Sequence, residues 1–388
     1  MDKKIEKWAK VLVDYSCNVQ RGEWVYLLTN CPETKPLYDA VRKEVLKKGA
    51  HVSDHFCYDP CGCTRMGIQH DDLFLTEASP EQLDCFPEFK LTEIKAMQAV
   101  IAIEGVSDSQ KMGEIPPWKY PRRMKTLNPL INERMKKRWV LTNYPTKFLA
   151  QNSGMTLKEL WNFVYSALFL KKEDPVAEWQ KVSDNQAELI DFLKDVELIR
   201  IKGVQSDLTL KVAGRIWDNC DGRFNFPDGE VFTGPIEDSA NGVIFFGDFP
   251  IICGGKEVSG IKLSFQSGKV IEASAEKGNE FLQSLLETDE GASYIGELGI
   301  GTNFGIQKPT KEILFDEKIG GTIHLALGDG YAETGSQNKS AIHQDIIKPL
   351  AIFNPNDPDQ AELLVLKGNS WFRLVKTAGK LSFKKVQE

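Results

Sequence analysis

The sequence changes in character near residue 196, and this change predicts two domains of different fold class. Before it, short apolar runs of the kind that form buried strands alternate with stretches of helical periodicity. The expected strands are residues 24–29, 52–58, 99–103 and 139–142, and the expected helices are residues 2–18, 36–49, 116–137, 156–171 and 176–195. Because strands that alternate with helices form βαβ units, we expect residues 1–196 to be an α/β domain with a mainly parallel sheet.

Beyond residue 197, apolar and polar residues alternate over short stretches, and glycines become dense. Residues 261–265 and 270–273 flank the glycine-containing segment 266–269, which predicts a β-hairpin. One helix is expected at residues 277–287. Residues 197–388 are therefore expected to form a second, α+β domain.

Charge and apolar content exclude several classes of protein. Lys and Arg total 48 against 55 Asp and Glu, a net charge of -7 that argues against a nucleic-acid-binding surface or a polybasic membrane anchor. The N-terminus carries charges where a signal peptide needs an apolar core. The densest apolar stretch, residues 243–252, is interrupted by Gly247, Asp248 and Pro250, well short of the roughly 20 apolar residues of a spanning helix. Since eight cysteines in 388 residues do not make a disulfide scaffold, we expect a cytoplasmic protein.

Two of the five histidines, His324 and His343, lie in the second half of the chain near acidic residues. In an extended strand His343 and Asp345 point the same way, so they could hold one metal ion, although a surface histidine beside an acid would look the same. In residues 322–328, Ile323, Leu325 and Leu327 would face one way and His324 the other. On that face His324 is either a ligand or a hydrogen-bonded structural histidine.

Two glutamates and one tyrosine stand in unusual surroundings. Glu230 follows a Pro- and Gly-rich turn, and Glu297 lies among apolar residues and glycines, where an unpartnered carboxylate is costly to bury. Tyr331 follows Gly-Asp-Gly and could stabilise an oxyanion, or simply pack. With Asp345, these groups give two histidines and three carboxylates, which suit a pair of divalent ions about 3.5–4 Å apart.

These segments resemble the M29 family of metallo-aminopeptidases. The resemblance is carried by residues 225–235, 314–317, 324–328 together with Tyr331, and 338–345, in the order glutamate, glutamate, histidine, tyrosine and His-x-Asp. It implies an N-terminal α/β domain, a C-terminal domain built on a mixed sheet, and a homodimer whose active sites face an internal cavity. It also implies release of the N-terminal residue from short peptides by a metal-activated water.

The residue roles follow from the same resemblance. The ligands of two divalent ions (zinc, cobalt, manganese or magnesium) would be Glu230, Glu297, His324, His343 and Asp345. Glu297 would bridge the ions or act as general base, and Tyr331 would be the catalytic tyrosine. Two features depart from the family pattern: Lys318 follows Asp316-Glu317 where asparagine is expected, and the segment between Tyr331 and His343 is short.

Two other functions fit parts of the pattern. A mononuclear Fe(II) ring-cleaving dioxygenase would use His324, His343 and Asp345 as a two-histidine, one-carboxylate triad, but leaves Glu230 and Glu297 without a role. A non-catalytic peptide-binding protein could keep the fold without turnover. Separately, His51, His55, Cys57, Cys61 and Cys63 have a zinc-like composition without the spacing of a regular zinc motif, and packing cysteines are the alternative.

Overall fold

The computed structural model describes residues 2–56, 72–105, 115–116, 118–247, 249–253, 256–355 and 360–387 of the chain. The chain divides into two compact units. Residues 1–178 and 222–228 form the first unit, and residues 179–221 and 229–388 form the second. No helix in the described ranges is long and apolar enough to cross a membrane.

Helix α9 (Pro175–Leu193) lies at this division. The boundary expected near residue 196 falls at the end of this helix, whereas the two units divide near its start. The reason is packing, because Leu189 and Leu193 of α9 belong to the core of the second unit.

The first unit contains a five-stranded parallel sheet in the order β2-β1-β3-β4-β8. Its strands are β1 (Trp24–Thr29), β2 (His51–Phe56), β3 (Ala99–Gly105), β4 (Arg138–Tyr144) and β8 (Asn225–Phe226). The helices are α1 (Lys3–Val11), α2 (Lys35–Lys47), α3 (Asp72–Glu77), α4 (Pro80–Asp84), α5 (Glu88–Ala96), α6 (Lys119–Met135), α7 (Lys147–Asn152) and α8 (Leu157–Ala167). The predicted α/β fold and its four strands are confirmed, and the short strand β8 comes from a distant segment that no local pattern indicated.

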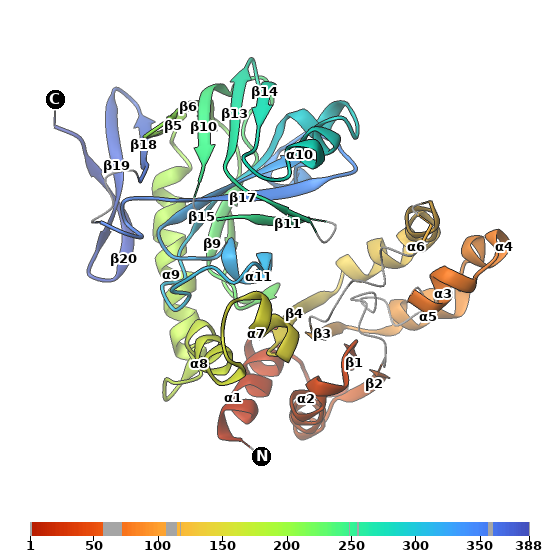
Figure 1. Ribbon diagram of the computed structural model, residues 1–388. Helices are drawn as coiled ribbons and strands as arrows, with labels where there is room; N and C mark the ends of the chain where they lie inside the picture. Colours follow the sequence, from red (N-terminus) through yellow and green to blue (C-terminus); the bar gives the residue numbers. More distant parts are fainter. Residues whose placement is uncertain are drawn as a thin grey trace. The chain divides into compact units, whose positions relative to one another are not determined.

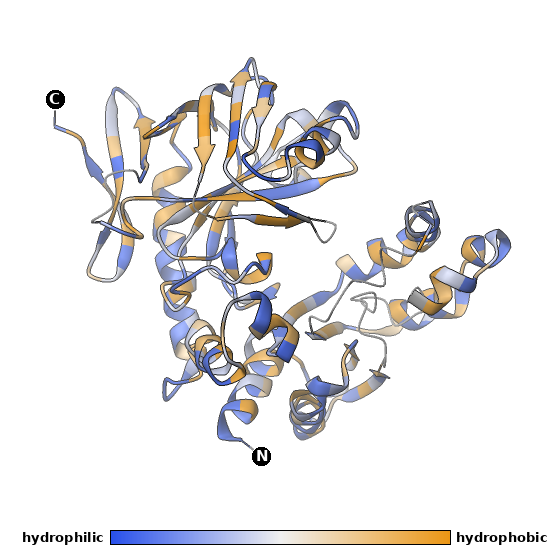
Figure 2. Ribbon diagram, in the orientation of Figure 1, coloured by the Kyte–Doolittle hydropathy of each residue, from blue (hydrophilic) through white to orange (hydrophobic). Residues whose placement is uncertain are grey.

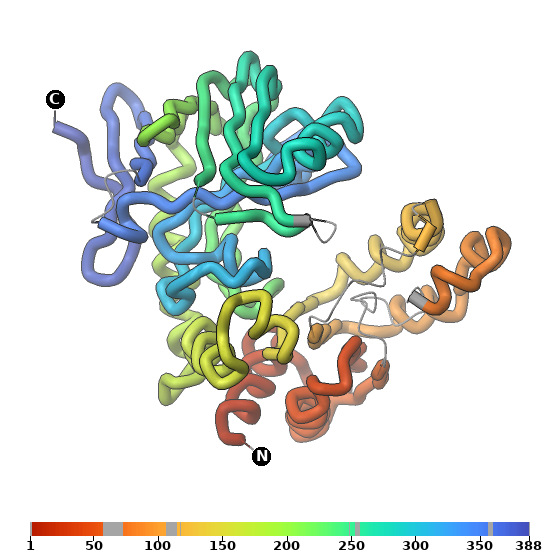
Figure 3. Tube along the Cα trace, viewed as in Figure 1, coloured from red at the N-terminus to blue at the C-terminus, as the bar shows by residue number. Residues whose placement is uncertain are grey.

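The second unit contains two larger antiparallel sheets and the small pair β11-β12. The eight-stranded sheet has the order β14-β13-β10-β6-β5-β18-β19-β20, and the five-stranded sheet has the order β17-β16-β15-β9-β7. Every described strand pair in this unit is antiparallel, and parallel pairing is limited to the isolated bridges Asn303–Ile319 and Leu350–Ala361. Figure 3 follows the chain through this unit from yellow-green at α9 to blue at the C-terminus.

The elements of the second unit are as follows. The strands are β5 (Leu198–Gly203), β6 (Ser206–Lys211), β7 (Asp218–Cys220), β9 (Glu230–Thr233), β10 (Asn241–Phe246), β11 (Ile251–Cys253), β12 (Lys256–Val258), β13 (Ile261–Gln266), β14 (Lys269–Ser274), β15 (Ile295–Gly301), β16 (Thr322–Gly328), β17 (His343–Pro349), β18 (Glu362–Lys367), β19 (Ser370–Thr377) and β20 (Lys380–Lys385). The helices, besides α9, are α10 (Asn279–Leu286) and α11 (Ile313–Asp316). The predicted hairpin is β13-β14 and the predicted helix is α10.

One hydrophobic core joins the two large sheets of the second unit. It takes apolar residues from both sheets and from α9. Figure 1 shows the ribbons of these two sheets and of α9. Figure 2 shows the hydrophobic residues running along these strands and alternating with hydrophilic ones on α9. Ile323, Leu325 and Leu327 of β16 belong to this core, so the predicted alternation is confirmed and the opposite face of the five-stranded sheet is left for polar residues.

Candidate metal centre

The register of the five-stranded sheet brings the expected ligands to one face. Glu297 of β15 lies opposite Ala326 of β16, and Ala326 lies opposite Asp345 of β17. Residues directly opposite each other in an antiparallel sheet share a face, and so do residues two apart in one strand. His324 and His343 therefore project from the same face as the two carboxylates.

Glu230 joins this face from β9, where it lies opposite Gly301 of β15. Glu297 and Gly301 are four residues apart in β15 and thus on the same side. The side chains from the other side of this sheet enter the core, among them Val231, Leu298 and Ile300. One face of the five-stranded sheet therefore carries the polar site, and the opposite face packs into the hydrophobic core.

A β-bulge is needed to place Glu297 on the polar face. The pairing shifts between Ile295 and Glu297, so that Gly296 is an extra residue in β15. If Gly296 were instead a regularly paired residue, Ile295 and Glu297 would share a face, and the carboxylate would point into the core. A Cβ at Gly296 would lie 2.3 Å from the carbonyl oxygen of Asp329, so only glycine fits there.

Gly299 makes room for the imidazole of His324, which lies opposite it. A Cβ at Gly299 would lie 2.0 Å from Cε1 and 2.1 Å from Nε2 of His324. The imidazole therefore occupies the volume beside the backbone of β15 where a side chain of residue 299 would otherwise be.

The first group of candidate ligands is Glu230, Glu297 and His324. All three are buried, with exposed fractions of 5%, 4% and 1%. Nε2 of His324 lies 3.1 Å from Oε1 of Glu297 and 3.4 Å from Oε2 of Glu230. One potential ligand atom from each residue lies within 4.8 Å of the other two.

The second group is Glu297, His343 and Asp345, which meets the same distance criterion. Nε2 of His343 lies 3.3 Å from Oε2 of Glu297 and 3.6 Å from Oδ1 of Asp345. Oδ1 of Asp345 is buried and has no hydrogen-bond partner among the described residues. Glu297 belongs to both groups and offers a different oxygen to each histidine.

Main-chain carbonyls orient both imidazoles. Nδ1 of His324 lies 3.2 Å from the carbonyl oxygen of Glu317, and Nδ1 of His343 lies 2.8 Å from that of Asp329. Because a carbonyl can only accept, each Nδ1 is the donor and each Nε2 faces the carboxylates. This is the arrangement by which proteins orient metal-binding histidines.

The carboxylates change the pKa values of both histidines. Burial lowers the pKa of His324, but the hydrogen bond to Glu297 and the charge of Glu230 outweigh burial and raise it to about 10. Burial also lowers the pKa of His343, but contacts with Asp345 and Glu297 outweigh burial and raise it to about 11. Burial raises the pKa of Glu297, but hydrogen bonds with the two histidines bring it down to about 2. The site thus favours positive charge at both imidazoles, as it would favour bound cations.

The site also contains two charged groups that the sequence patterns did not assign. Glu317 and Lys318 follow the short helix α11. Nζ of Lys318 pairs with Oε1 of Glu230 and lies 2.6 Å from Oε1 of Glu317. Burial, opposed by Lys318 and reinforced by the charge of Glu230, raises the pKa of Glu317 to about 7. The Asp-Glu pair within the family-like segment, and the lysine that follows it in place of the expected asparagine, are the sequence signals that point here.

The side-chain amide of Gln186, on α9, is hydrogen-bonded to the main chain at Glu230. Its Nε2 donates to the carbonyl oxygens of Glu230, at 2.6 Å, and Cys220, at 3.1 Å. Its Oε1 accepts from the hydroxyl of Thr302 at 3.0 Å. This amide fixes the end of β9 relative to the end of β15.

Tyr331 lies beside the second group of ligands. Its ring makes edge contacts with His343 and Phe232, with centroid separations of 5.2 and 5.3 Å. The residue is 42% exposed. Partial burial and the charges of Glu297 and Asp345 raise the pKa of its hydroxyl, so it stays protonated and can donate a hydrogen bond.

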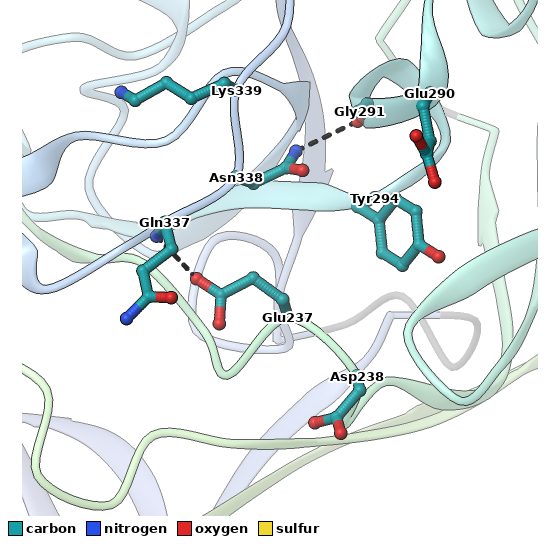
Figure 4. Close-up of a pocket in the computed structure, with 8 residues that line it drawn as sticks. All are labelled: Glu237, Asp238, Glu290, Gly291, Tyr294, Gln337, Asn338 and Lys339. Atoms are coloured by element: carbon teal, nitrogen blue, oxygen red, sulfur yellow. Dashed lines mark hydrogen bonds between the residues drawn. The ribbon is translucent and has the colours of Figure 1, made fainter.

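The segment after Tyr331 borders a polar cavity of about 510 Å³ (Figure 4). Nδ2 of Asn338 donates to the carbonyl oxygens of Gly328 and Gly291, at 2.6 and 2.9 Å. The backbone N–H of Gln337 donates to Glu237 at 2.7 Å. The cavity is lined by Glu237, Asp238, Glu290, Gly291, Tyr294, Gln337, Asn338 and Lys339. Its wall is therefore hydrogen-bonded to the turn that presents Tyr331.

The N-terminal histidines lie in the first unit. The ring of His51 stacks on Trp24 with centroids 4.8 Å apart, and Nε2 of His55 lies 2.8 Å from Oε1 of Glu93. Cys57, Cys61 and Cys63 lie outside the described residues, so the metal site suggested there stays a prediction.

A sheet face with two oriented imidazoles and three converging carboxylates is of the class used by metal-dependent hydrolases. Comparison with known families agrees: the family described as thermophilic metalloprotease (M29) matches residues 1–365. This chain therefore belongs to the M29 family of metallopeptidases.

Relatives and solved structures extend this result. Aminopeptidase 2 of Geobacillus stearothermophilus is 27% identical over 383 residues, covering 89% of this chain and 87% of the relative. Aminopeptidase T of Thermus aquaticus is 33% identical over 192 residues, 46% of each chain. The structure of wild-type AmpT from Thermus thermophilus superposes with a TM-score of 0.77 at 23% identity, over 96% of this chain and 98% of that one.

A dioxygenase shares the same fold at lower similarity. The structure of 2,5-dihydroxypyridine dioxygenase from Pseudomonas putida KT2440 has a TM-score of 0.54 at 14% identity, over 98% of this chain and 96% of that one. This likeness shows a common scaffold and no more.

Proposed function

We propose that this protein is an aminopeptidase that releases the N-terminal residue of short peptides, with two divalent ions bound by Glu230, Glu297, His324, His343 and Asp345 in the second unit. The observation that carries the proposal is the position of Glu297, which belongs to both ligand groups. A carboxylate shared by two sets of ligands is what a pair of neighbouring ions requires.

The residues present fit such ions. Oδ1 of Asp345 is buried without a hydrogen-bond partner among the described residues, which is costly unless a cation is bound. The donors are imidazole nitrogens and carboxylate oxygens, a set that suits zinc, cobalt and manganese and leaves magnesium possible. Bound divalent ions would supply Lewis-acid chemistry, lowering the pKa of a water molecule and polarising the scissile carbonyl.

The side chains supply proton transfer and hydrogen bonding. Of the two roles expected for Glu297, shared ligation is the one that its place in both ligand groups supports. A general base works best with a pKa near the working pH, and Glu317, whose pKa is raised to about 7, meets that condition, so we assign it the exchange of protons with the leaving amine. The protonated hydroxyl of Tyr331 donates to the oxyanion that forms on the scissile carbonyl.

The dioxygenase alternative is less well supported. A mononuclear triad of His324, His343 and Asp345 gives no role to Glu230 or to the shared position of Glu297. The relatives that cover most of the chain are named aminopeptidases.

The proposal includes a homodimer and a cytoplasmic location. The dimer is supported by the family resemblance, and light scattering coupled to size-exclusion chromatography tests it. The location is supported by Cys17 and Cys31, which are buried thiols outside any disulfide. Fractionation of cells followed by immunoblotting tests the location.

The decisive experiment measures leucine release from a leucyl anilide and a leucyl dipeptide. The chain is assayed as isolated, after chelation, after each metal is restored, and as Glu297→Gln. We expect metal-dependent cleavage that the substitution abolishes. Absence of cleavage with every metal would overturn the proposal, and oxygen uptake with Fe(II) would favour the dioxygenase.

A further inference from the structure

A lysine ammonium is buried inside the candidate metal centre. Lys318 is 1% exposed, and its Nζ pairs with Glu230 and Glu317. Burying an ammonium costs free energy unless nearby groups compensate the loss of water, and here two carboxylates do so. The centre therefore contains a fixed positive charge of its own before any ion binds.

This charge lies next to one ligand group and not the other. Lys318 contacts Glu230 directly, at the oxygen Oε1, while Oε2 is directed at His324. Glu230 therefore has one oxygen engaged by the ammonium. In the second group, the ion-pair contact of Asp345 among the described residues is with His343, and its Oδ1 accepts no hydrogen bond.

We propose that Lys318 makes the two ion sites unequal. This inference rests on the proposed function. The group of Glu230, Glu297 and His324 binds its divalent ion more weakly, because the ammonium repels the ion and leaves Glu230 a single oxygen for it. The group of Glu297, His343 and Asp345 binds the tighter ion. The enzyme then gains or loses one ion as the free metal concentration changes, while the other stays bound.

Metal binding to the full chain tests this without any assay of activity. The chelator-treated protein is dialysed against a series of free Co²⁺ concentrations, and bound cobalt is measured by elemental analysis and by its visible absorption. We expect two ions per chain with dissociation constants that differ by at least about tenfold. Lys318→Gln, which keeps a hydrogen-bond donor but removes the charge, is expected to tighten the weaker class by about tenfold or more.

Three further variants test which ligand group binds the tighter ion and whether the charge of Lys318 causes the difference in affinity. Asp345→Asn should remove the tighter class and leave the weaker one. Lys318→Arg should keep the difference because it keeps the charge. Lys348→Gln is the matched control: Lys348 is also buried, at 3% exposed, and its Nζ donates to the carbonyl oxygen of Phe245, so its loss should change neither class.

Equal affinities in the wild-type chain would overturn the inference, whether or not Lys318→Gln folds. So would an unchanged weaker class in a Lys318→Gln protein with native circular dichroism. Either result leaves the proposed function standing, since two ions still bind. A wild-type chain that binds no Co²⁺ at the candidate centre would overturn the proposed function and the inference with it.

Discussion

At the scale of single residues, the centre depends as much on missing side chains as on ligands. Gly299 has no side chain, so the imidazole of His324 occupies that volume. A methyl group at this position would meet Nε2 at 2.1 Å, and the imidazole would have to move away from Glu297. The candidate ligand His324 therefore depends on the glycine opposite it for its position.

Gly299→Ala is expected to weaken metal binding by roughly 10- to 100-fold, the range for disturbed support of a ligand. Peptide cleavage should fall in proportion at limiting metal and partly recover with excess metal. Cobalt titration and leucine release measure the two effects. Gly368→Ala, a substitution in open space at a positive φ, is the control for general loss of stability. Full metal affinity in Gly299→Ala would contradict this account of the site.

Substitution by glutamine should affect activity and metal binding differently at Glu317 and at Glu297. Glu317→Gln removes the group whose pKa is about 7, so kcat should fall by roughly 10²- to 10⁴-fold while both ions stay bound. Glu297→Gln should lose metal as well as activity. The exposed Glu333, close in sequence to Tyr331, gives the control Glu333→Gln. Unchanged kcat in Glu317→Gln would remove Glu317 from the reaction.

At the scale of elements, the alternation of apolar and polar residues along the strands predicts most of the site. The parts it does not predict lie at a bulge, after a short helix and in a short strand. The pattern of residues 322–328 places His324 away from the core, and the structure agrees. The bulge at Gly296 has no such signal, because simple alternation would put Ile295 and Glu297 on one face. Lys318 follows a four-residue helix, where no periodicity exists to indicate its direction. Strand β8 is two residues long and pairs with a distant strand, which local pattern does not show.

Gly296→Val tests the role of the bulge. A Cβ at Gly296 would lie 2.3 Å from the carbonyl oxygen of Asp329, so the bulge must shift, and in a regular strand of all three residues either Glu297 turns toward the core or Ile295 turns toward the site. We expect loss of metal binding and a lower melting temperature, since a buried carboxylate or an exposed isoleucine results. Calorimetry with and without metal distinguishes these outcomes. A Gly296→Val variant with native metal affinity would show that the register shift does not position Glu297.

At the scale of the whole molecule, metal binding and protonation compete. A raised pKa of a basic group stabilises the folded state fully below its unfolded value, and this contribution is lost as the pH rises through the folded value. For His324 and His343 the folded values are about 10 and about 11 against an ordinary value of 6.5, so the metal-free chain loses this stabilisation steadily as the pH rises from 6.5 to about 11. Ions bind the neutral imidazoles, so loading with metal has the opposite dependence on pH.

Loading the metal-free chain at pH 8 should therefore release about two protons. Titration calorimetry in two buffers of different ionisation enthalpy measures the number. His324→Asn should release about one fewer, and Lys348→Gln should match the wild type. Release of no protons on binding would show that the imidazoles are neutral in the metal-free chain.

The hairpin of β16 and β17 carries the candidate ligands His324, His343 and Asp345 in its strands and Tyr331 in its loop. Pairing between Gly328 and His343 closes the hairpin, so the ligands lie within the paired strands and the loop lies entirely outside them. Insertions or deletions between those two residues leave every ligand in register. They change instead the wall of the polar cavity and the setting of Tyr331. This hairpin can thus alter what borders Tyr331 without altering the pairing that holds the candidate metal centre.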